Sequence, residues 1–164
     1  MNQTASLVLE SATIWRDDTG CGGVETSILI DAPARRVWQV LTDFEHMSEW
    51  SSGLQRIEGE LRDGAEVTSH YRMFDKVWPA KHRLRVQQGV SFGWSDDLDG
   101  EFSRVRDNHG FAVRDLGETL CQFVHTDAFT GVDGPRFGAM LARAAVDSYR
   151  AFNRELQARA TREP

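Results

Sequence analysis

Five residues in this chain are suited to acid–base chemistry: Tyr71, His82, His109, His125 and Asp127. Histidine exchanges a proton near neutral pH, and tyrosine can donate one to an oxygen that gains negative charge. His125 and Asp127 are two positions apart, a spacing that places both side chains on one face of a strand. A carboxylate beside an imidazole fixes its tautomer and raises its basicity, which suits a general base. The same pair suits a structural contact equally well, and both interpretations stay open.

The other candidates also have structural interpretations. His82 fits a core histidine with a backbone partner, and His109, which precedes Gly110, fits a solvated residue at a bulge. Tyr71 fits an aromatic residue of a sheet. Their residue types therefore indicate possible chemistry without requiring it.

Metal and nucleophilic chemistry have less support. Three imidazoles and a carboxylate could in principle ligate an ion, but His82 should lie at least two strands from the others. We therefore expect no metal and no cofactor. The chain has no Gly-x-Ser-x-Gly motif, and Cys121 stands among apolar residues of an expected strand, where thiols are usually inert.

Composition narrows the class of protein. A chain of 164 residues fits one domain with a genuine core, and a net charge of −6 argues against nucleic acid as a partner. No apolar run is long enough to insert in a membrane. Cys21 and Cys121 lack metal-type spacing and suit a reducing cytoplasm. Lysine occurs only at 76 and 81 among many arginines, which resembles the composition of GC-rich bacterial genomes.

The element best placed to organise these residues is one long helix over residues 134–159. Asp133 and Gly134 can cap it, and Pro135 suits its first turn. At helical spacing its apolar residues form one wide face, made of Phe137, Leu141, Ala144, Ala145, Tyr149, Phe152 and Leu156. A face this wide requires a large partner surface.

The rest of the chain predicts that surface. A strand at 24–31 is followed by two short helices up to Trp50, and then by six segments of period two between Leu54 and Gly131. We therefore expect an α+β fold in which a curved, seven-stranded antiparallel sheet wraps around the helix. Residues 24–160 form this single domain. Residues 1–23 form an extension that is a partly ordered tail, a flap or an added strand.

Hairpin geometry predicts which side chains meet on the inner face. The expected opposite pairs are Val86 and Val90, Leu84 and Phe92, His82 and Trp94, Val113 and Cys121, Phe111 and Phe123, and His109 and His125, with Tyr71 beside His82. A mostly apolar pocket with a few polar groups is typical of a small-molecule site. Its expected ligand-binding residues are Met73, Phe92, Trp94, Phe111, Phe123, Phe137 and Leu141.

Segments 28–33 (ILIDAP) and 37–43 (VWQVLTD), followed by Trp50, resemble the opening of the SRPBCC superfamily of helix-grip, START-like proteins. Trp94 and segment 119–131 are similar to later strands of that superfamily, and the likeness covers about residues 24–156. The resemblance implies an internal cavity between sheet and helix that takes an apolar small molecule.

The polyketide cyclase/dehydrase-like branch of this superfamily suggests one function, a cofactor-independent enzyme acting on a poly-carbonyl substrate. His125 oriented by Asp127, or His109, would remove a proton beside a carbonyl, and Tyr71 or His82 would protonate the developing oxyanion. The alternative is a non-catalytic protein that binds or transfers a lipid-like or isoprenoid-like ligand. In either case we expect a cytoplasmic protein, possibly a homodimer.

Two further observations bear on these functions. Aromatising relatives often use a pocket arginine, but Arg72, Arg83, Arg85 and Arg114 all fall on outward positions. This argues against aldol-type aromatisation. An interaction module similar to chaperone activators would need an exposed apolar patch, and the sequence predicts none outside residues 1–23.

Overall fold

The computed structural model describes residues 9–73 and 75–162. Its helices and strands follow one another in the order β1 (Glu10–Arg16), β2 (Gly22–Ile30), α1 (Ala34–Thr42), the 3-10 helix η1 (Phe44–Glu49), β3 (Leu54–Glu58), β4 (Glu66–Met73), β5 (Lys76–Arg83), β6 (Arg85–Gln87), β7 (Ser91–Asp97), the 3-10 helix η2 (Gly100–Phe102), β8 (Arg106–Gly117), β9 (Leu120–Thr130) and α2 (Gly134–Ala160). The long terminal helix expected from the apolar spacing is α2, and the two short helices are α1 and η1.

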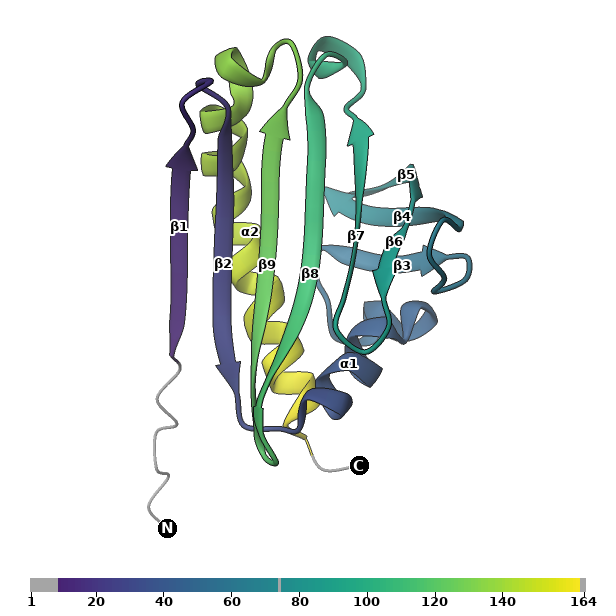
Figure 1. The fold of residues 1–164 in the computed structure, drawn as a ribbon. Helices are drawn as coiled ribbons and strands as arrows, with labels where there is room; N and C mark the ends of the chain where they lie inside the picture. The colour runs from purple at the N-terminus through teal and green to yellow at the C-terminus, as the bar shows by residue number, and fades with distance from the viewer. Residues whose placement is uncertain (1–8, 74, 163–164) are drawn as a thin grey trace.

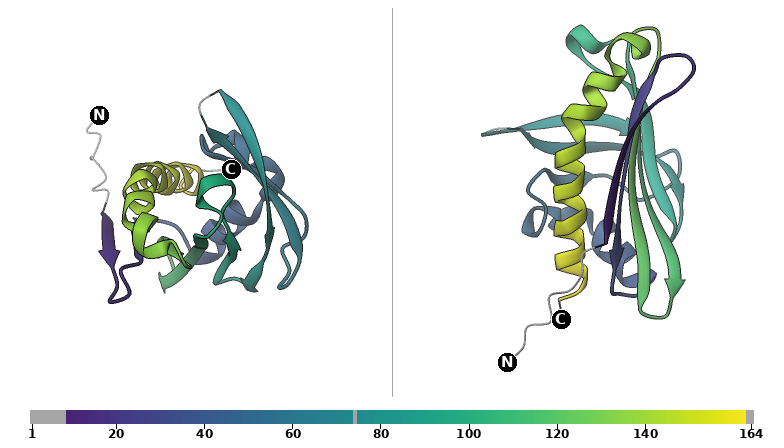
Figure 2. Two further views of the ribbon diagram at one scale, coloured as in Figure 1. Left: turned by 90° about the horizontal axis from the view of Figure 1, so that it is seen from above. Right: turned by 90° about the vertical axis from the view of Figure 1, so that its left-hand side faces the viewer.

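The strands form two antiparallel sheets. Six of them pair in the order β1-β2-β9-β8-β7-β6, and β3, β4 and β5 form a separate sheet in that order. In Figure 1, α2 runs along one face of the six-stranded sheet, and the strands of the smaller sheet cross the direction of the larger one. Figure 2 shows the same helix from above and from the side. The predicted α+β, helix-grip architecture is confirmed.

The predicted single sheet of seven strands needs correction, because the described residues form nine strands in two sheets. One additional strand is β1. The other arises because the predicted strand over residues 80–86 divides at Leu84 into β5 and β6. The Leu84 N–H donates to the carbonyl of Ala65, and its own carbonyl accepts from Gly64. These two bonds hold Leu84 against the loop before β4, and the chain passes from one sheet to the other at this residue.

Residues 10–16 of the extension form the edge strand β1, which pairs with β2. Glu10 attaches this strand to α2, since its carboxylate accepts hydrogen bonds from Arg150 and Arg154. These bonds lower the pKa of Glu10 to about 2. Among the alternatives for the extension, an added strand therefore describes residues 10–16, while residues 1–8 lie outside the described part of the chain.

The hairpins have a different register from the one predicted. In the β8–β9 pair, His109 lies opposite Asp127, Phe111 opposite His125 and Val113 opposite Phe123. Each partner is two residues beyond the expected one, because a bulge between Asp115 and Gly117 moves the turn towards β9. A shift of two keeps every side chain on its predicted face and changes only its neighbours.

The other two predicted registers also change. In β6–β7, Val86 lies opposite Phe92, because the loop has three residues with Gly89 at a φ of 75°. In β4–β5, Tyr71 lies opposite Trp78, and His82 lies opposite Val67. Tyr71 is therefore not beside His82.

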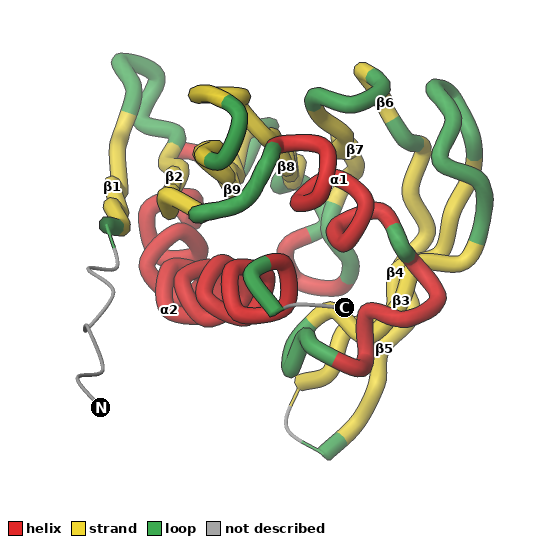
Figure 3. Tube along the Cα trace, turned by 90° about the horizontal axis from the view of Figure 1, so that it is seen from below, coloured by secondary structure: helices red, strands yellow, loops and turns green. Residues whose placement is uncertain are grey.

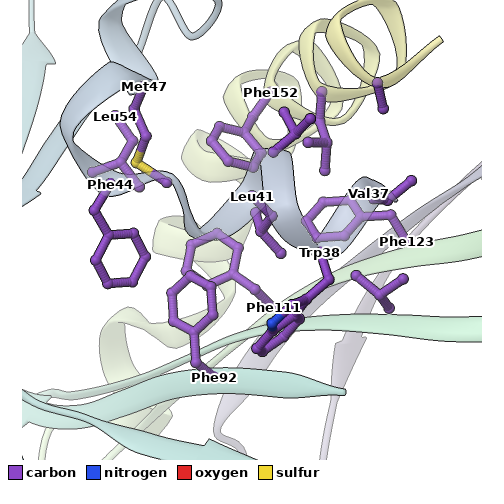
Figure 4. Packing of buried hydrophobic residues seen from close by; sticks show 14 of the residues in the cluster. Val37, Trp38, Leu41, Phe44, Met47, Leu54, Phe92, Phe111, Phe123 and Phe152 are labelled. Carbon is purple, nitrogen blue, oxygen red and sulfur yellow. The ribbon is translucent and has the colours of Figure 1, made fainter. Parts of the chain in front are cut away.

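The main core lies where α1, η1 and the second half of α2 meet the large sheet. Figure 4 shows Phe152 of α2 with Trp38 and Leu41 of α1 and with Phe92 and Phe111 of the sheet. Phe92 packs edge-on against Trp38 and Phe44, at ring distances of 6.2 and 5.4 Å. These buried aromatic residues hold α1 and α2 in place over the sheet.

In Figure 3, which views the molecule from below, α2 and the three-stranded sheet lie on the same side of the large sheet.

The first half of α2 lies close against β2. Gly22 and Gly138 permit this approach, because a Cβ added to Gly138 would lie 2.5 Å from the backbone nitrogen of Gly22. A second cluster, centred on Val24, Val105 and Phe129, packs under this half. None of the described helices is long and apolar enough to span a lipid bilayer.

Candidate functional site

A cavity of about 490 Å³ lies between α2, the three-stranded sheet and the strands β8 and β9. Its walls are mostly apolar, and all three structural units contribute to them. The wall residues that matter for binding are Tyr71, Met73 and Trp78 from the small sheet, His109, Phe111 and His125 from the large sheet, and Tyr149 and Phe152 from α2. The volume is within the range of about 300–1,000 Å³ that is usual for small-molecule sites.

A second hollow, of about 570 Å³, is lined by residues of all three strands of the small sheet and of β7. Charged side chains line most of it, among them Glu58, Glu66, Lys81 and Asp96. Because these charged side chains suit an apolar ligand poorly, we regard the first cavity as the candidate site.

Two histidines face each other beside this cavity. The Nε2 atoms of His109 and His125 are 2.7 Å apart, so one nitrogen donates a hydrogen bond to the other. The ring of Tyr149 stacks on His125, with a centroid distance of 3.8 Å and an angle of 11° between the ring planes. The alternation of β8 and β9 brings both imidazoles to the inner face, and α2 covers them.

Asp127 contacts Tyr149 and not His125. The Tyr149 hydroxyl donates to Oδ2 of Asp127 at 2.7 Å and lies 3.3 Å from Nδ1 of His109. Among the described residues no hydrogen bond joins Asp127 to the ring of His125, so the predicted orienting contact is not formed. The cause is the register of the hairpin, which places His109 opposite Asp127.

A further carboxylate completes this cluster. Asp107 accepts a hydrogen bond from the indole nitrogen of Trp94 at 3.2 Å, and its Oδ1 atom is 4.0 Å from Nδ1 of His109. Within the described part of the chain, neither Asp107 nor Asp127 forms an ion pair with a lysine or arginine. The cluster therefore contains two carboxyl groups and no permanent cation paired with them.

Asn153 of α2 lies beside His125. Its amide nitrogen donates to the Thr26 hydroxyl at 2.9 Å, while its Oδ1 atom and Nδ1 of His125 are buried without a hydrogen-bond partner among the described residues. Asn153 raises the pKa of His125, in opposition to the larger effect of burial. The contact between the two Nε2 atoms requires that one of them carries a proton, and either histidine can be the donor.

Burial controls the protonation of the whole cluster. It lowers the pKa of His109 to about 3, helped by the neighbouring His125, and it lowers the pKa of His125 to about 3. Burial, and then Asp107, raises the pKa of Asp127 well above its usual range. The pKa values of Tyr71 and Tyr149 are also raised, first by burial. At neutral pH both imidazoles are therefore uncharged and both tyrosines are protonated.

The structure brings together only part of the predicted site. Tyr71, Met73, His109, Phe111 and His125 line the cavity, and Asp127 lies against Tyr149. The other predicted ligand-binding residues do not line it: Phe92, Trp94 and Phe123 are in the main core, and Phe137 and Leu141 pack on the second cluster.

His82 also lies outside the cavity. Its ring nitrogens contact Ser69 Oγ at 2.8 Å and Asp96 Oδ2 at 2.9 Å, and its ring stacks on Trp94 at 4.2 Å. It is thus a buried histidine with side-chain partners, and its predicted catalytic role has no support in this geometry.

Sequence reasoning missed Tyr149, Asp107 and Trp78. It was also wrong about Arg72, which was predicted to point outward and is part of the cavity lining. Tyr149 was counted among the apolar residues of the helix, although a tyrosine facing a strand that carries His125 and Asp127 is a signal for a hydrogen bond. Asp107 lies at the start of β8, on the same face as His109. Trp78 precedes the strand predicted from residue 80 onward, and the structure includes it in β5.

Asp107, His109 and Asp127 each offer one possible metal ligand atom, and these atoms all lie within 4.8 Å of one another. Nδ1 of His109 is 3.7 Å from Oδ2 of Asp127 and 4.0 Å from Oδ1 of Asp107. The Tyr149 hydroxyl also already donates to the Oδ2 atom of Asp127. We assign no metal to these residues.

Comparisons with known proteins agree with this architecture. The family model described as "Polyketide cyclase / dehydrase and lipid transport" matches residues 22–161. The comparison with curated proteins found no match.

Three solved structures illustrate the likeness of fold. The Zhui aromatase/cyclase from Streptomyces sp. R1128 is 19% identical with a TM-score of 0.65, over 84% of this chain and 92% of that one. A START superfamily protein from Mycobacterium smegmatis is 14% identical with a TM-score of 0.64, over 84% and 96%. Human STARD10 is 11% identical with a TM-score of 0.64, over 97% and 72%. At these identities the similarity shows the fold alone.

Proposed function

This chain belongs to the polyketide cyclase / dehydrase and lipid transport family, and from this premise we propose that it is a cyclase/dehydrase-like enzyme that acts on an apolar, carbonyl-bearing molecule. The observation that carries the proposal is the cavity itself. Its walls are largely apolar, and Tyr149, His109 and His125 contribute polar groups that contact one another. Such a site holds the carbon skeleton of a ligand by burial and its oxygen atoms by directed hydrogen bonds.

The first contribution to catalysis is confinement. A poly-carbonyl chain in solution samples many conformations, and few of them bring the reacting carbons together. A cavity with walls from both sheets and from α2 selects folded conformations before the reaction begins, which lowers the entropic part of the barrier.

The second contribution is proton donation by tyrosine. Tyr149 and Tyr71 have raised pKa values, so both hydroxyl groups stay protonated at neutral pH. When a proton is removed beside a carbonyl, negative charge develops on the carbonyl oxygen, and a fixed hydroxyl donor stabilises that charge. Tyr149 is the better placed of the two, because Asp127 and His109 fix the position of its hydroxyl group.

The histidine pair has a weaker role than the sequence suggested. A pKa of about 3 makes a neutral imidazole a poor base towards water. A neutral imidazole of this kind can accept a proton from the ligand only if negative charge develops nearby in the same step. The enolate that Tyr149 holds provides this charge. The contact between the two Nε2 atoms has to open before either imidazole takes up the α-proton as the enolate forms, because it engages Nε2 of both rings.

The test begins with the native ligand. The protein is purified from its host and extracted with organic solvent, and the extract is identified by mass spectrometry. A cyclised or dehydrated poly-carbonyl product supports the proposal. Turnover of that compound's precursor is then compared in the wild type and in Tyr149→Phe, where a loss in kcat with little change in ligand affinity is expected. Equal losses in both would contradict proton donation by Tyr149.

A non-catalytic lipid-like or isoprenoid-like carrier is the second candidate, and one observation favours it. Nε2 of both histidines is engaged in the contact between the rings, and the Nδ1 atom of His125 is buried. Imidazoles arranged in this way suit fixed hydrogen-bonding partners as well as proton acceptors. A stoichiometric lipid in the extract, with no product from any carbonyl compound of suitable size, would favour the carrier.

A further inference from the structure

Asp107 and Asp127 are two largely buried acids whose carboxylate oxygens lie within 4.8 Å of each other, and no lysine or arginine of the described residues pairs with either. Asp127 is 2% exposed, and the side chain of Asp107 is 14% exposed. Their Oδ2 atoms each accept one hydrogen bond, from Trp94 and from Tyr149. Their Oδ1 atoms have no donor among the described residues. Two adjacent carboxylates in this environment would repel each other with little solvent to screen them.

The groups around the pair do not supply positive charge. Tyr71 from β4, His109 and His125 from the large sheet, and Tyr149 from α2 are all neutral at pH 7, as the directions of their pKa shifts show. His82 from β5 lies beyond Trp94 and pairs with its own carboxylate, Asp96. An electropositive occupant between the two acids would remove their mutual repulsion.

We propose that Asp107 and Asp127 share one proton at neutral pH, and that this proton supports proton donation by Tyr149 into the cavity. A proton is the smallest such occupant. A carboxylic acid beside a carboxylate forms a strong hydrogen bond, and each carboxyl group raises the proton affinity of the other. Asp107 does not line the cavity, so in this proposal it is a positioning residue that acts through Asp127.

The second half of the proposal rests on the proposed function, and its proton transfer balances. Tyr149 gives its hydroxyl proton to the ligand's enolate oxygen, which forms one O–H bond and breaks another. The Tyr149 oxygen then takes the shared proton from Asp127 across the 2.7 Å contact. The pair is left with two negative charges, while the proton from the ligand's α-carbon lies on the histidine pair. That proton returns to the carboxylates, directly or through water, when the product leaves.

The shared proton is tested in the ligand-free protein by infrared spectroscopy at pH 7. A protonated carboxylic acid has a C=O stretching band above the carboxylate bands, and this band shifts in D2O. We expect the band in the wild type and in Asp96→Asn. Asp96→Asn is the matched control, because it removes the carboxylate that contacts the buried His82. We expect loss of the band in both Asp127→Asn and Asp107→Asn. In Tyr149→Phe the band should remain but shift, because one hydrogen bond to Asp127 is lost.

Absence of the band in the wild type at pH 7 would overturn the proposal, and so would its survival in Asp127→Asn. Elemental analysis accompanies the measurement, since one bound metal ion per chain without the band would show that a cation occupies the position instead. If the asparagine variants do not fold, the wild-type band followed as pH rises decides the question. Loss of the band only above neutral pH supports the pair, and its disappearance below pH 7 contradicts it.

The link to Tyr149 needs a separate readout. In Asp107→Asn, turnover at neutral pH should fall about 10-fold with unchanged ligand affinity, and the alkaline limb of the pH–rate profile should move to lower pH. A purely structural Asp107 would leave that limb in place. If the wild type shows no turnover at all, the proposed function fails, while the infrared result still decides whether the proton is shared.

Discussion

Two buried histidines pack against the same indole ring, and their surroundings differ. His82 stacks on Trp94 at 4.2 Å, and His109 packs against it at 4.8 Å. His82 has one hydroxyl and one carboxylate as partners, and that carboxylate, Asp96, has a side chain that is 32% exposed. His109 faces the acids Asp107 and Asp127, which are almost out of contact with solvent.

The difference separates a structural contact from the cluster where we propose chemistry. Both ring nitrogens of His82 have a hydrogen-bond partner. The cluster around His109 contains two acids whose Oδ1 atoms have no hydrogen-bond donor among the described residues. It also borders a cavity large enough for a ligand. Residue type cannot distinguish two histidines. They differ in the number of acids around the ring and in whether those acids have hydrogen-bond donors.

The largest expected effect is the loss of turnover in Tyr149→Phe. Loss of the hydroxyl donor should lower turnover by about 100-fold to 10,000-fold, which is the usual contribution of a general acid. The measurement is kcat and ligand affinity on the same precursor. Asp96→Asn, on the His82 side of Trp94, serves as the control and should leave both unchanged. A comparable loss in Asp96→Asn would show that the two regions are coupled.

The next effect is on the pH dependence of stability. The folded-state pKa of His125 is about 3, below its ordinary value of 6.5, so between these values the unfolded chain binds more protons than the folded protein. The free energy of unfolding therefore falls as the pH drops from 6.5 towards 3, by up to about 1.4 kcal/mol per pH unit for this residue. In His125→Gln this dependence should become shallower, as measured by urea unfolding at several pH values.

His46 provides the control for that experiment. It is exposed, and its hydrogen bond to Asp43 raises its pKa, so any contribution from it has the opposite sign. His46→Gln should therefore leave the acid-side decline in place. If His125→Gln keeps the wild-type slope, His125 is not held neutral by burial.

A smaller effect is expected from Asp96→Ala. It leaves Nδ1 of the buried His82 without its partner, and an unsatisfied buried polar group costs about 1–3 kcal/mol. Because solvent reaches the side chain of Asp96, we expect a value near the lower limit, measured as a change in the free energy of unfolding. Turnover should not change. Asp97→Ala, which removes only an exposed ion pair with Arg106, should leave stability unaltered.

The smallest effect concerns the cavity wall. Trp78→Ala removes an aromatic wall from the mouth of the cavity and should weaken ligand binding about 5–10-fold without loss of stability, because half of the side chain is already exposed. Val77→Ala is the matched control, since Val77 is similarly exposed on the same strand but does not line the cavity. Equal losses in the two variants would show that exposure and not position determines the effect.

Much of the fold could be predicted because the apolar pattern is long and regular. The helix expected over residues 134–159 is α2, and the alternation in β8 and β9 placed the correct side chains on the inner face. Register could not be predicted, because it depends on a bulge near Gly117 and on the length of the turn. The division of one predicted strand at Leu84 depends on backbone contacts with Gly64 and Ala65, which leave no pattern in the sequence.

The site was less predictable than the fold. Period two identifies the inward face of a strand but gives no information on depth, so Phe92 and Phe123 of the core could not be separated from Phe111 of the cavity wall. Tyr149 was hidden for a related reason. On an amphipathic helix, a tyrosine that packs and a tyrosine that donates a hydrogen bond occupy the same apolar face.

The separation of the two sheets has a consequence for how such proteins diverge. The three-stranded sheet supplies Tyr71, Met73 and Trp78 to the cavity wall, whereas His109, His125 and Tyr149 come from the large sheet and α2. Substitutions in one unit can therefore reshape the space for a ligand while the other unit keeps its histidines and its tyrosine. Under the proposed function, the choice of ligand and the type of reaction can then change separately in a lineage of such chains.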